Sequence, residues 1–88
     1  MDMTPITGIT IRDVFSSWVY SDVTLYPECT LGELYEAVNT ALGQPGRLNA
    51  VRCLLMLSDR RTLVADPKAL LGEQPIRSGD TLYIVGRN

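Results

Sequence analysis

One sharply bounded amphipathic helix, just before the middle of the sequence, constrains the fold more than any other feature. It begins with a capping box, in which the Thr30 hydroxyl can accept from the amide of Glu33 and the Glu33 carboxylate reaches back to the amide of Thr30. Gly43 ends the helix, and Pro45-Gly46 prevents its continuation. Between these limits apolar residues recur at helical spacing: Leu31, Leu34, Val38, Ala41 and Leu42. The pattern predicts a helix over about 31–42 with one apolar face to bury.

Two segments typical of strands precede this helix. Residues 19–25 are rich in β-branched and aromatic side chains, and their alternation predicts a strand with Val19, Val23 and Leu25 on one face. Residues 6–15 fit a second strand that pairs with it as a hairpin. Residues 10–18 also fit a short helix capped by Thr10, with Ile11, Val14, Phe15 and Trp18 at helical spacing. We favour the strand because the segment 19–25 needs a partner nearby.

Further strand signals follow the helix. The apolar run over 51–57 has the length of a strand, and residues 62–64 predict a short returning strand. The polar turn between them contains Arg60-Arg61, which we expect to be the solvated tip of a hairpin. Residues 69–71 fit a single helical turn. Gly79-Asp80 then introduces an alternating terminal strand over 81–85.

This order of elements predicts an α+β fold. The 88 residues suffice for one compact domain but not for two, so we expect a single domain over 1–88. The early hairpin and the late strands can bury their apolar faces only by sharing one sheet that packs on the single helix. The expected architecture is therefore a mixed, four- to five-stranded sheet packed on one helix.

Two segments of this chain carry a resemblance to the ubiquitin-like (β-grasp) family. Residues 30–34, Thr-Leu-Gly-Glu-Leu, look like the start of that family's helix after its second strand. Residues 76–84 are similar to the family's closing pattern, in which an isoleucine precedes a turn and an alternating last strand. The chain looks most like the small stand-alone bacterial members, such as the YukD-type component of type VII secretion. This resemblance implies a β-grasp domain that works by binding other proteins.

The last residues depart from one branch of that family. Conjugated modifiers and the sulfur carriers of thiamine and molybdopterin synthesis end in Gly-Gly, which lets the tail thread the narrow channel of an activating enzyme. This sequence ends Val85-Gly86-Arg87-Asn88, where a cation and an amide follow a single glycine. We therefore expect neither modifier nor sulfur-carrier chemistry.

The composition offers little from which to build a catalytic or metal site. Histidine, the commonest general base near neutral pH, is absent. The carboxylates do not cluster, and we expect Glu33 and Glu36 on the solvated side of the helix. The glycines form no phosphate-binding loop. Cys29 and Cys53 belong to no CxxC pair. We predict no enzyme activity, no cofactor and no metal.

The net charge and the hydropathy of the chain limit the kinds of partner and the cellular location that we expect. The formal net charge is −2, and the basic residues do not gather into a face that suits nucleic acid. No segment approaches the roughly 18 apolar residues needed to cross a bilayer, and residues 1–5 lack the features of a signal peptide. We expect a cytoplasmic protein with no nucleic-acid partner and no direct membrane insertion.

Strand parity predicts where a protein partner would bind. Alternation directs one set of side chains into the core: Cys53, Leu55, Leu57, Leu82 and Ile84. In the resembled family the two strands concerned are neighbours, and their outer face carries the main recognition patch. The predicted partner-binding set on that face is Arg52, Leu54, Met56, Tyr83 and Val85. The alternative is that the segment 65–75 or the C-terminal residues cover Leu54 and Met56.

The function that follows is that of an adaptor. An apolar patch with an aromatic ring and an arginine has the make-up of an interface core. We expect a non-catalytic module that docks on a larger assembly or a membrane-associated machine, such as a bacterial type VII secretion apparatus. The alternative is a non-catalytic small subunit of a multicomponent bacterial oxygenase.

Overall fold

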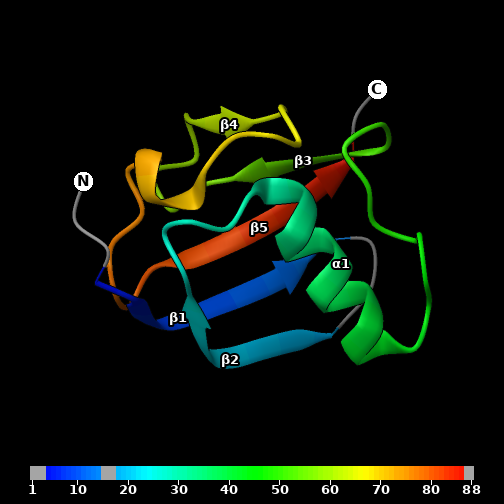
Figure 1. Cartoon of the computed structure of the whole chain (residues 1–88), viewed down its shortest axis with the longest axis horizontal. Helices are drawn as coiled ribbons and strands as arrows, with labels where there is room; N and C mark the ends of the chain where they lie inside the picture. Colours follow the sequence, from blue (N-terminus) through cyan, green and yellow to red (C-terminus); the bar gives the residue numbers. More distant parts are fainter. Residues whose placement is uncertain (1–3, 15–17, 87–88) are drawn as a thin grey trace.

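The computed structural model describes residues 4–14 and 18–86, and its elements follow the predicted order (Figure 1). The strands are β1 (Ile6–Asp13), β2 (Val19–Leu25), β3 (Cys53–Met56), β4 (Leu63–Val64) and β5 (Thr81–Gly86). The helices are α1 (Leu31–Leu42) and a short 3-10 helix, η1 (Leu71–Glu73). The limits of α1 and β2 agree with the predicted ranges.

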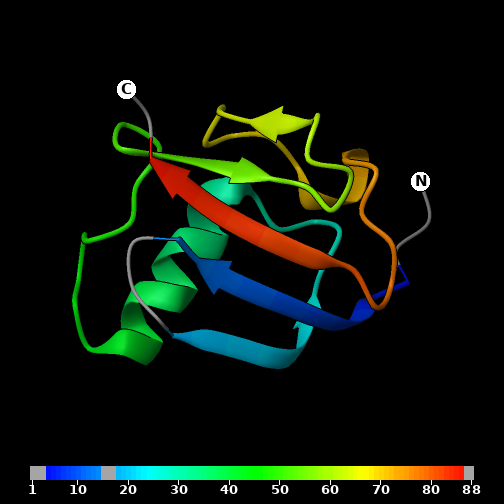
Figure 2. The ribbon, with the colours of Figure 1, turned by 180° about the vertical axis from the view of Figure 1, so that it is seen from behind.

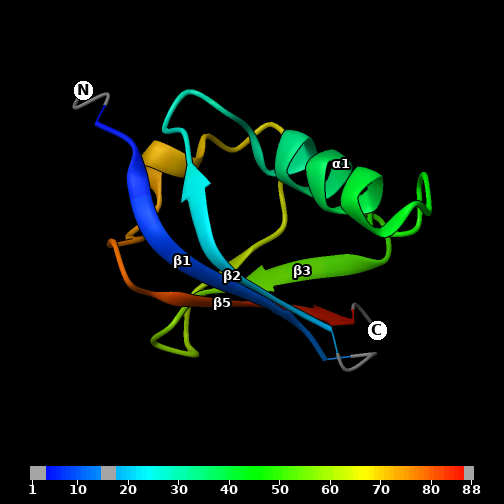
Figure 3. The same cartoon turned by 90° about the horizontal axis from the view of Figure 1, so that it is seen from below.

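The five strands form one mixed sheet in the order β2-β1-β5-β3-β4. β1 and β5 run parallel at its centre, whereas the other neighbouring pairs are antiparallel (Figure 2). α1 lies over one face of this sheet, and the opposite face carries no helix of the described residues (Figure 3). The predicted α+β architecture, a mixed sheet packed on one helix, is confirmed with five strands.

Both ends of α1 are formed as the sequence predicts. The Glu33 amide donates to the Thr30 hydroxyl over 3.2 Å, and the Thr30 amide donates to the Glu33 carboxylate over 3.1 Å. Gly43 has a φ of 69°, a left-handed conformation that glycine adopts at little cost, and its N–H caps the last turn. Local hydrogen bonds therefore determine where this helix begins and ends.

The core lies between α1 and the sheet. Alternation along β3 and β5 directs the predicted inward residues into it. Its largest fully buried side chains are Tyr35, Ile9, Ile11, Leu31, Leu55, Leu71, Leu82 and Ile84. Burying one large apolar side chain contributes roughly 1.5–3 kcal/mol relative to leaving it exposed. The single layer of contacts between α1 and the sheet thus supplies most of the favourable free energy of folding.

The predicted face of Val19 is wrong. Between Tyr20 and Val23, β2 advances three residues while its partner β1 advances two. The extra residue makes a β-bulge, at which Asp22 has a φ of 58°. One added residue reverses the alternation, so Tyr20 and Val23 share the helix side of the sheet. Val19 instead lies on the other face, where it is 44% exposed.

The sequence predicts a strand over 51–57, but β3 begins only at Cys53. The side-chain oxygen of Asn49 accepts hydrogen bonds from the amides of Val51 and Arg52, each over 3.0 Å. This side-chain bond holds residues 49–52 in a turn and leaves Val51 exposed. The apolar pattern could not reveal this, because the turn depends on Asn49 upstream of the run.

The structure also tests the two helical segments that the sequence suggested at 10–18 and 69–71. Residues 10–13 are extended, because β1 pairs with β2 on one side and with β5 on the other. The helical interpretation of 10–18 is therefore wrong for residues 10–13, while residues 15–17 lie outside the described part of the chain. The helical turn expected at 69–71 is found two residues later, as η1.

Buried polar contacts fix the loop that follows α1. The Asn39 carboxamide donates to the Leu48 carbonyl and accepts from the Leu48 amide, both over 2.9 Å. Arg47 lies 3.9 Å from the Asp13 carboxylate, whose side chain is fully buried at the end of β1. These contacts hold the loop against the helix and the sheet at once.

Candidate protein-binding surface

Four of the five predicted partner-binding residues lie together on the sheet face opposite α1. Leu54 of β3 is the register partner of Val85 of β5, and Met56 is the partner of Tyr83. All four side chains are partly exposed, whereas Leu55 between them is 0% exposed. The alternation of β3 and β5 therefore presents two apolar pairs side by side.

Arg52 lies apart from these pairs. It is exposed in the turn held by Asn49, before β3 begins. Strand parity cannot assign its side chain to a face, because the residue is not part of the ladder. The predicted cationic member of the set is thus not aligned with the four others.

Strand register extends this surface across the whole sheet. Tyr83 pairs with Met56 on one side and with Arg12 on the other. Met56 pairs in turn with Leu63, and Arg12 with Val19. Residues in register share a face, so the row crosses all five strands. We call this row and the neighbouring apolar pair the outer sheet face: Arg12, Val19, Leu54, Met56, Leu63, Tyr83 and Val85.

Three members of the outer sheet face were missed by the sequence patterns. Val19 was assigned to the wrong face because the bulge reverses the parity of β2. Arg12 joins the row only because the first and last strands pair in parallel, which no local pattern records. Leu63 could have been predicted from the sequence, because it precedes the buried Val64 and adjacent strand residues face opposite sides of the sheet.

A second cation lies on this surface. The Arg60 guanidinium lies 5.6 Å from the centre of the Tyr83 ring, within the range of a cation–π contact. The turn that carries Arg60 is fixed to β5 by Ser58, whose hydroxyl donates to the Thr81 carbonyl over 2.7 Å and accepts from its amide over 3.0 Å. The hairpin tip is exposed, as expected, but its first arginine lies against an aromatic ring.

The carboxylates adjacent in sequence to these arginines are engaged elsewhere. Asp59 accepts from the amides of Arg61 and Thr62 within its own turn, and these bonds lower the pKa of its carboxyl group. Asp13, beside Arg12, is buried and points to the other side of β1. The outer sheet face therefore combines apolar side chains with Arg12, and Arg60 lies beside it over the Tyr83 ring.

The segment 65–75 lies on the helix side of the sheet and leaves Leu54 and Met56 uncovered. Its backbone bonds to the chain just before and at the start of α1, as in the 2.9 Å bond from the Leu71 amide to the Cys29 carbonyl. Leu71 is buried there, under the end of β2. One of the two alternatives for covering the patch thus does not occur, and residues 87–88 lie outside the described chain.

The described residues were compared with the requirements of a metal site and of a membrane-spanning helix. Within residues 4–14 and 18–86, no group of three or more His, Cys, Asp or Glu side chains could hold a metal ion. Cys29 and Cys53 are free thiols, and Cys53 is a core residue. No helix in this same part of the protein has the length and apolar character needed to cross a membrane.

A helix packed on a mixed sheet, with the first and last strands parallel at its centre, defines the ubiquitin-like β-grasp fold. The ubiquitin-like domain of yeast Ddi1 is similar with a TM-score of 0.70 and 16% identity, over 100% of this chain and 95% of that one. A ubiquitin-like domain from tubulin-binding cofactor B is similar with a TM-score of 0.69 and 13% identity, over 93% of this chain and 89% of that one. A designed protein based on ubiquitin is similar with a TM-score of 0.68 and 24% identity, over 96% of this chain and 90% of that one.

These likenesses confirm the expected ubiquitin-like β-grasp fold. No protein-family model matches the sequence, and no curated protein matches it either. Because the sequence identities are this low, the structural matches show the fold and nothing about the function. The finer resemblance to a YukD-type bacterial protein stays a prediction.

Proposed function

We propose that this chain is a single non-catalytic domain over 1–88 that docks on a larger protein assembly through the outer sheet face. The observation that carries the proposal is the row of side chains in register across all five strands. At its centre Tyr83 lies between Met56 and Arg12. Tyr and Arg are the residue types most enriched among the anchors of protein interfaces.

The chemistry of this face favours a partner that is apolar at its centre and acidic at its rim. Leu54, Val85 and Met56 offer apolar area that a partner can desolvate. Arg12 and Arg60 flank the Tyr83 ring and can pair with carboxylates of the partner. Arg52 is exposed before β3 and does not belong to the row.

The resemblance of the sequence to the YukD-type component supports a bacterial type VII secretion apparatus, on its cytoplasmic side, as that assembly. The alternative is that the domain is the non-catalytic small subunit of a multicomponent bacterial oxygenase. The two differ in the protein that co-purifies, which is a membrane-associated ATPase in the first case and a diiron oxygenase in the second.

Affinity capture from a lysate of the source organism tests the proposal. The bait is the folded chain, with Leu54→Asp as the binding variant and Thr40→Asp as the control, since Thr40 is exposed on α1. We expect one assembly to be captured by the wild type and by Thr40→Asp but not by Leu54→Asp. Equal capture by all three proteins would contradict the role of the outer sheet face.

A further inference from the structure

The two sides of this protein differ in charge. Between Asp13 and Gly46 the sequence has five carboxylates and no Lys or Arg, whereas seven of the eight basic residues follow Gly46. The acidic stretch contains β2 and α1, and α1 covers one face of the sheet (Figure 3). On the opposite side, none of the seven members of the outer sheet face is acidic, and Arg60 lies 5.6 Å from the centre of its Tyr83 ring. The helix side is therefore acidic and the outer sheet face basic.

The exposed residues of α1 form one stripe along its outer side. They recur at positions i, i+3, i+4 and i+7 and therefore share a face of the helix: Glu33, Glu36, Ala37 and Thr40. The pKa of the Cys29 thiol, just before the helix, is raised first by desolvation and then by the negative charges of Glu33 and Glu28. The stripe thus begins in a negative field and continues over small side chains, which let another surface approach the helix closely.

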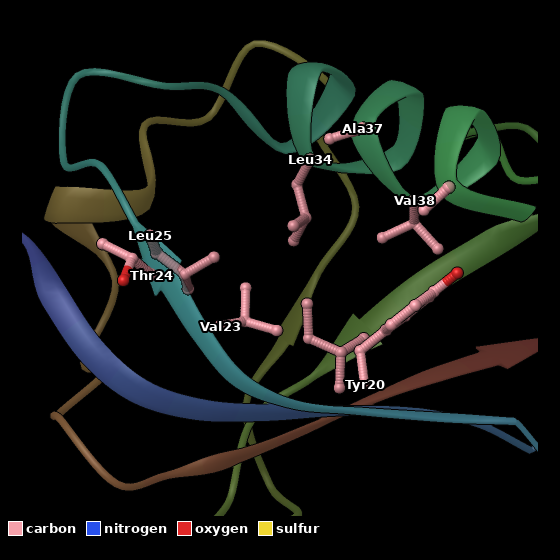
Figure 4. Close-up of a pocket in the computed structure, with 9 residues that line it drawn as sticks. Tyr20, Val23, Thr24, Leu25, Leu34, Ala37 and Val38 are labelled. Carbon is pink, nitrogen blue, oxygen red and sulfur yellow. The ribbon is translucent and has the colours of Figure 1, made fainter.

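An apolar cavity of about 200 Å³ lies beside this stripe, between α1 and β2 (Figure 4). Leu34 and Val38 line it from the helix, and Tyr20 and Val23 line it from the strand. Ala37 lines the same cavity and also belongs to the stripe, so the acidic residues of α1 border apolar area. We call the stripe, Glu28 and this cavity together the helix-side surface.

The helix-side surface has the composition that a partner of the outer sheet face needs. Its apolar area can desolvate the two apolar pairs of β3 and β5, and its glutamates can pair with Arg12 and Arg60. The protein measures 31 × 23 × 22 Å, so one broad face offers roughly 700 Å², close to the ~800 Å² that each partner gives to a standard interface. Exposed ion pairs contribute little each, so a contact of this size and charge is weak and depends on protein concentration.

We propose that a second copy of this chain docks its helix-side surface on the outer sheet face. Two different surfaces meet in this contact, so each pair of copies keeps one free outer sheet face and one free helix-side surface. Because the two surfaces lie on opposite sides of the molecule, the same contact can repeat and produce a head-to-tail chain of copies. This self-association rests on the proposed function in its use of the outer sheet face, where a larger assembly and a second copy would compete.

Sedimentation velocity of the purified full chain tests the contact. The chain is measured from about 10 µM to about 1 mM, at roughly 0.05 M and roughly 0.5 M NaCl, because salt screens exposed ion pairs. At low salt we expect the weight-average sedimentation coefficient to rise with protein concentration and to pass the value of a dimer. The association constant should be at least about tenfold lower at high salt.

Two variants each block one of the two surfaces. Leu54→Asp introduces a charge into the centre of the outer sheet face. The α1 variant, Glu36→Arg with Ala37→Arg, makes the stripe basic, and its new arginines lie three and four positions from Glu33, where they support the helix. Arg77→Glu changes an exposed residue that belongs to neither surface, and it is the control.

A mixture of the two variants distinguishes head-to-tail docking from other kinds of self-association. Each variant alone should stay monomeric under conditions in which the wild type and Arg77→Glu assemble, because each has lost one of the two surfaces. An equimolar mixture should recover a dimer, since the intact outer sheet face of the α1 variant can dock on the intact helix-side surface of Leu54→Asp. That dimer should grow no further, and its affinity should lie within about threefold of the wild-type contact.

Three results would overturn the proposal. The first is a wild-type chain that stays monomeric at about 1 mM and low salt. The second is assembly of the α1 variant alone, which would assign self-association to a symmetric contact between two outer sheet faces. The third is a mixture of the two variants that does not associate. Capture from lysate by the α1 variant tests the proposed function separately, because that variant keeps its outer sheet face and is expected not to self-associate.

Discussion

Leu54 on β3 and Val85 on β5 lie directly opposite each other, and both side chains are partly exposed on the face of the sheet that α1 does not cover. Leu55, the next residue, is 0% exposed on the other face. Two adjacent leucines thus lie on opposite faces of the sheet, and we expect substitutions at each to separate partner binding from stability.

Leu54→Asp should abolish docking on the partner while the fold persists. The half-buried side chain contributes little to the core, so we expect the free energy of unfolding to fall by about 1–2 kcal/mol. Loss of a central interface anchor should weaken partner binding by about 2 kcal/mol or more. Urea unfolding and the dispersion of the amide NMR spectrum check the fold. Collapse of that spectrum would show that Leu54 belongs to the core.

Leu55→Ala should lower the stability of the fold instead of removing a contact with the partner. Removing a fully buried leucine typically costs about 2–5 kcal/mol, through lost burial and the cavity left behind. That is a large part of the total stability of a domain this small. We expect a large fall in the urea midpoint, or a chain that is largely unfolded at 37 °C. A loss below about 1 kcal/mol would contradict the assignment of this side chain to the core.

Thr30→Ala should remove the N-cap of α1. The Thr30 hydroxyl accepts from the Glu33 amide, and alanine leaves that donor without its partner in the capping box. We expect the free energy of unfolding to fall by about 1 kcal/mol, measured by thermal or urea unfolding. Thr30→Ser keeps the hydroxyl and is the control. Equal losses in both variants would attribute the effect to the lost methyl group instead.

Gly72→Ala should disturb the contact between η1 and the segment before α1. A Cβ atom at this position would lie 2.6 Å from the Cβ of Pro27, closer than such atoms approach. We expect a loss of about 1–3 kcal/mol, as for other overpacked contacts, with amide shifts at Cys29 and Leu71. Glu73→Ala, at the adjacent exposed position, is the control and should be nearly neutral. Unchanged shifts at Cys29 would exclude the steric contact.

The stability contributed by Asp59 should depend on pH. Backbone amides of Arg61 and Thr62 lower the pKa of this carboxyl group below its ordinary value of 3.8. Because the folded-state pKa is the lower one, the contribution is complete above the unfolded-state pKa and is lost as the pH falls through the folded-state pKa. We expect the wild type to exceed Asp59→Asn in stability at pH 7, and the difference to vanish in acid. A difference that persists undiminished at pH 2 would contradict this cause.

The helix, the terminal strand and the inward-facing residues of β3 could all be predicted from the amino-acid sequence alone. α1 is bounded by Thr30 and Gly43, whose effects act over three or four residues, so the printed sequence contains all the information required. The alternation of β3 and β5 likewise made it possible to predict four members of the outer sheet face. Capping and alternation both depend on residues that are close together in the sequence, so they can be recognised without knowledge of the fold.

The order of the strands in the sheet, and the point at which the alternation of β2 breaks, could not be predicted from local sequence patterns. The parallel pairing of β1 with β5 brings Arg12 beside Tyr83, although the two are far apart in the sequence. The bulge at Asp22 moves Val19 to the outer sheet face and leaves Tyr20 on the side of the sheet that faces α1. The bulge holds Asp22, a non-glycine residue, at a φ of 58°, and the neighbouring strand and the burial of the residues around it stabilise this conformation. Its position therefore depends on contacts that form only when the whole sheet has packed on α1.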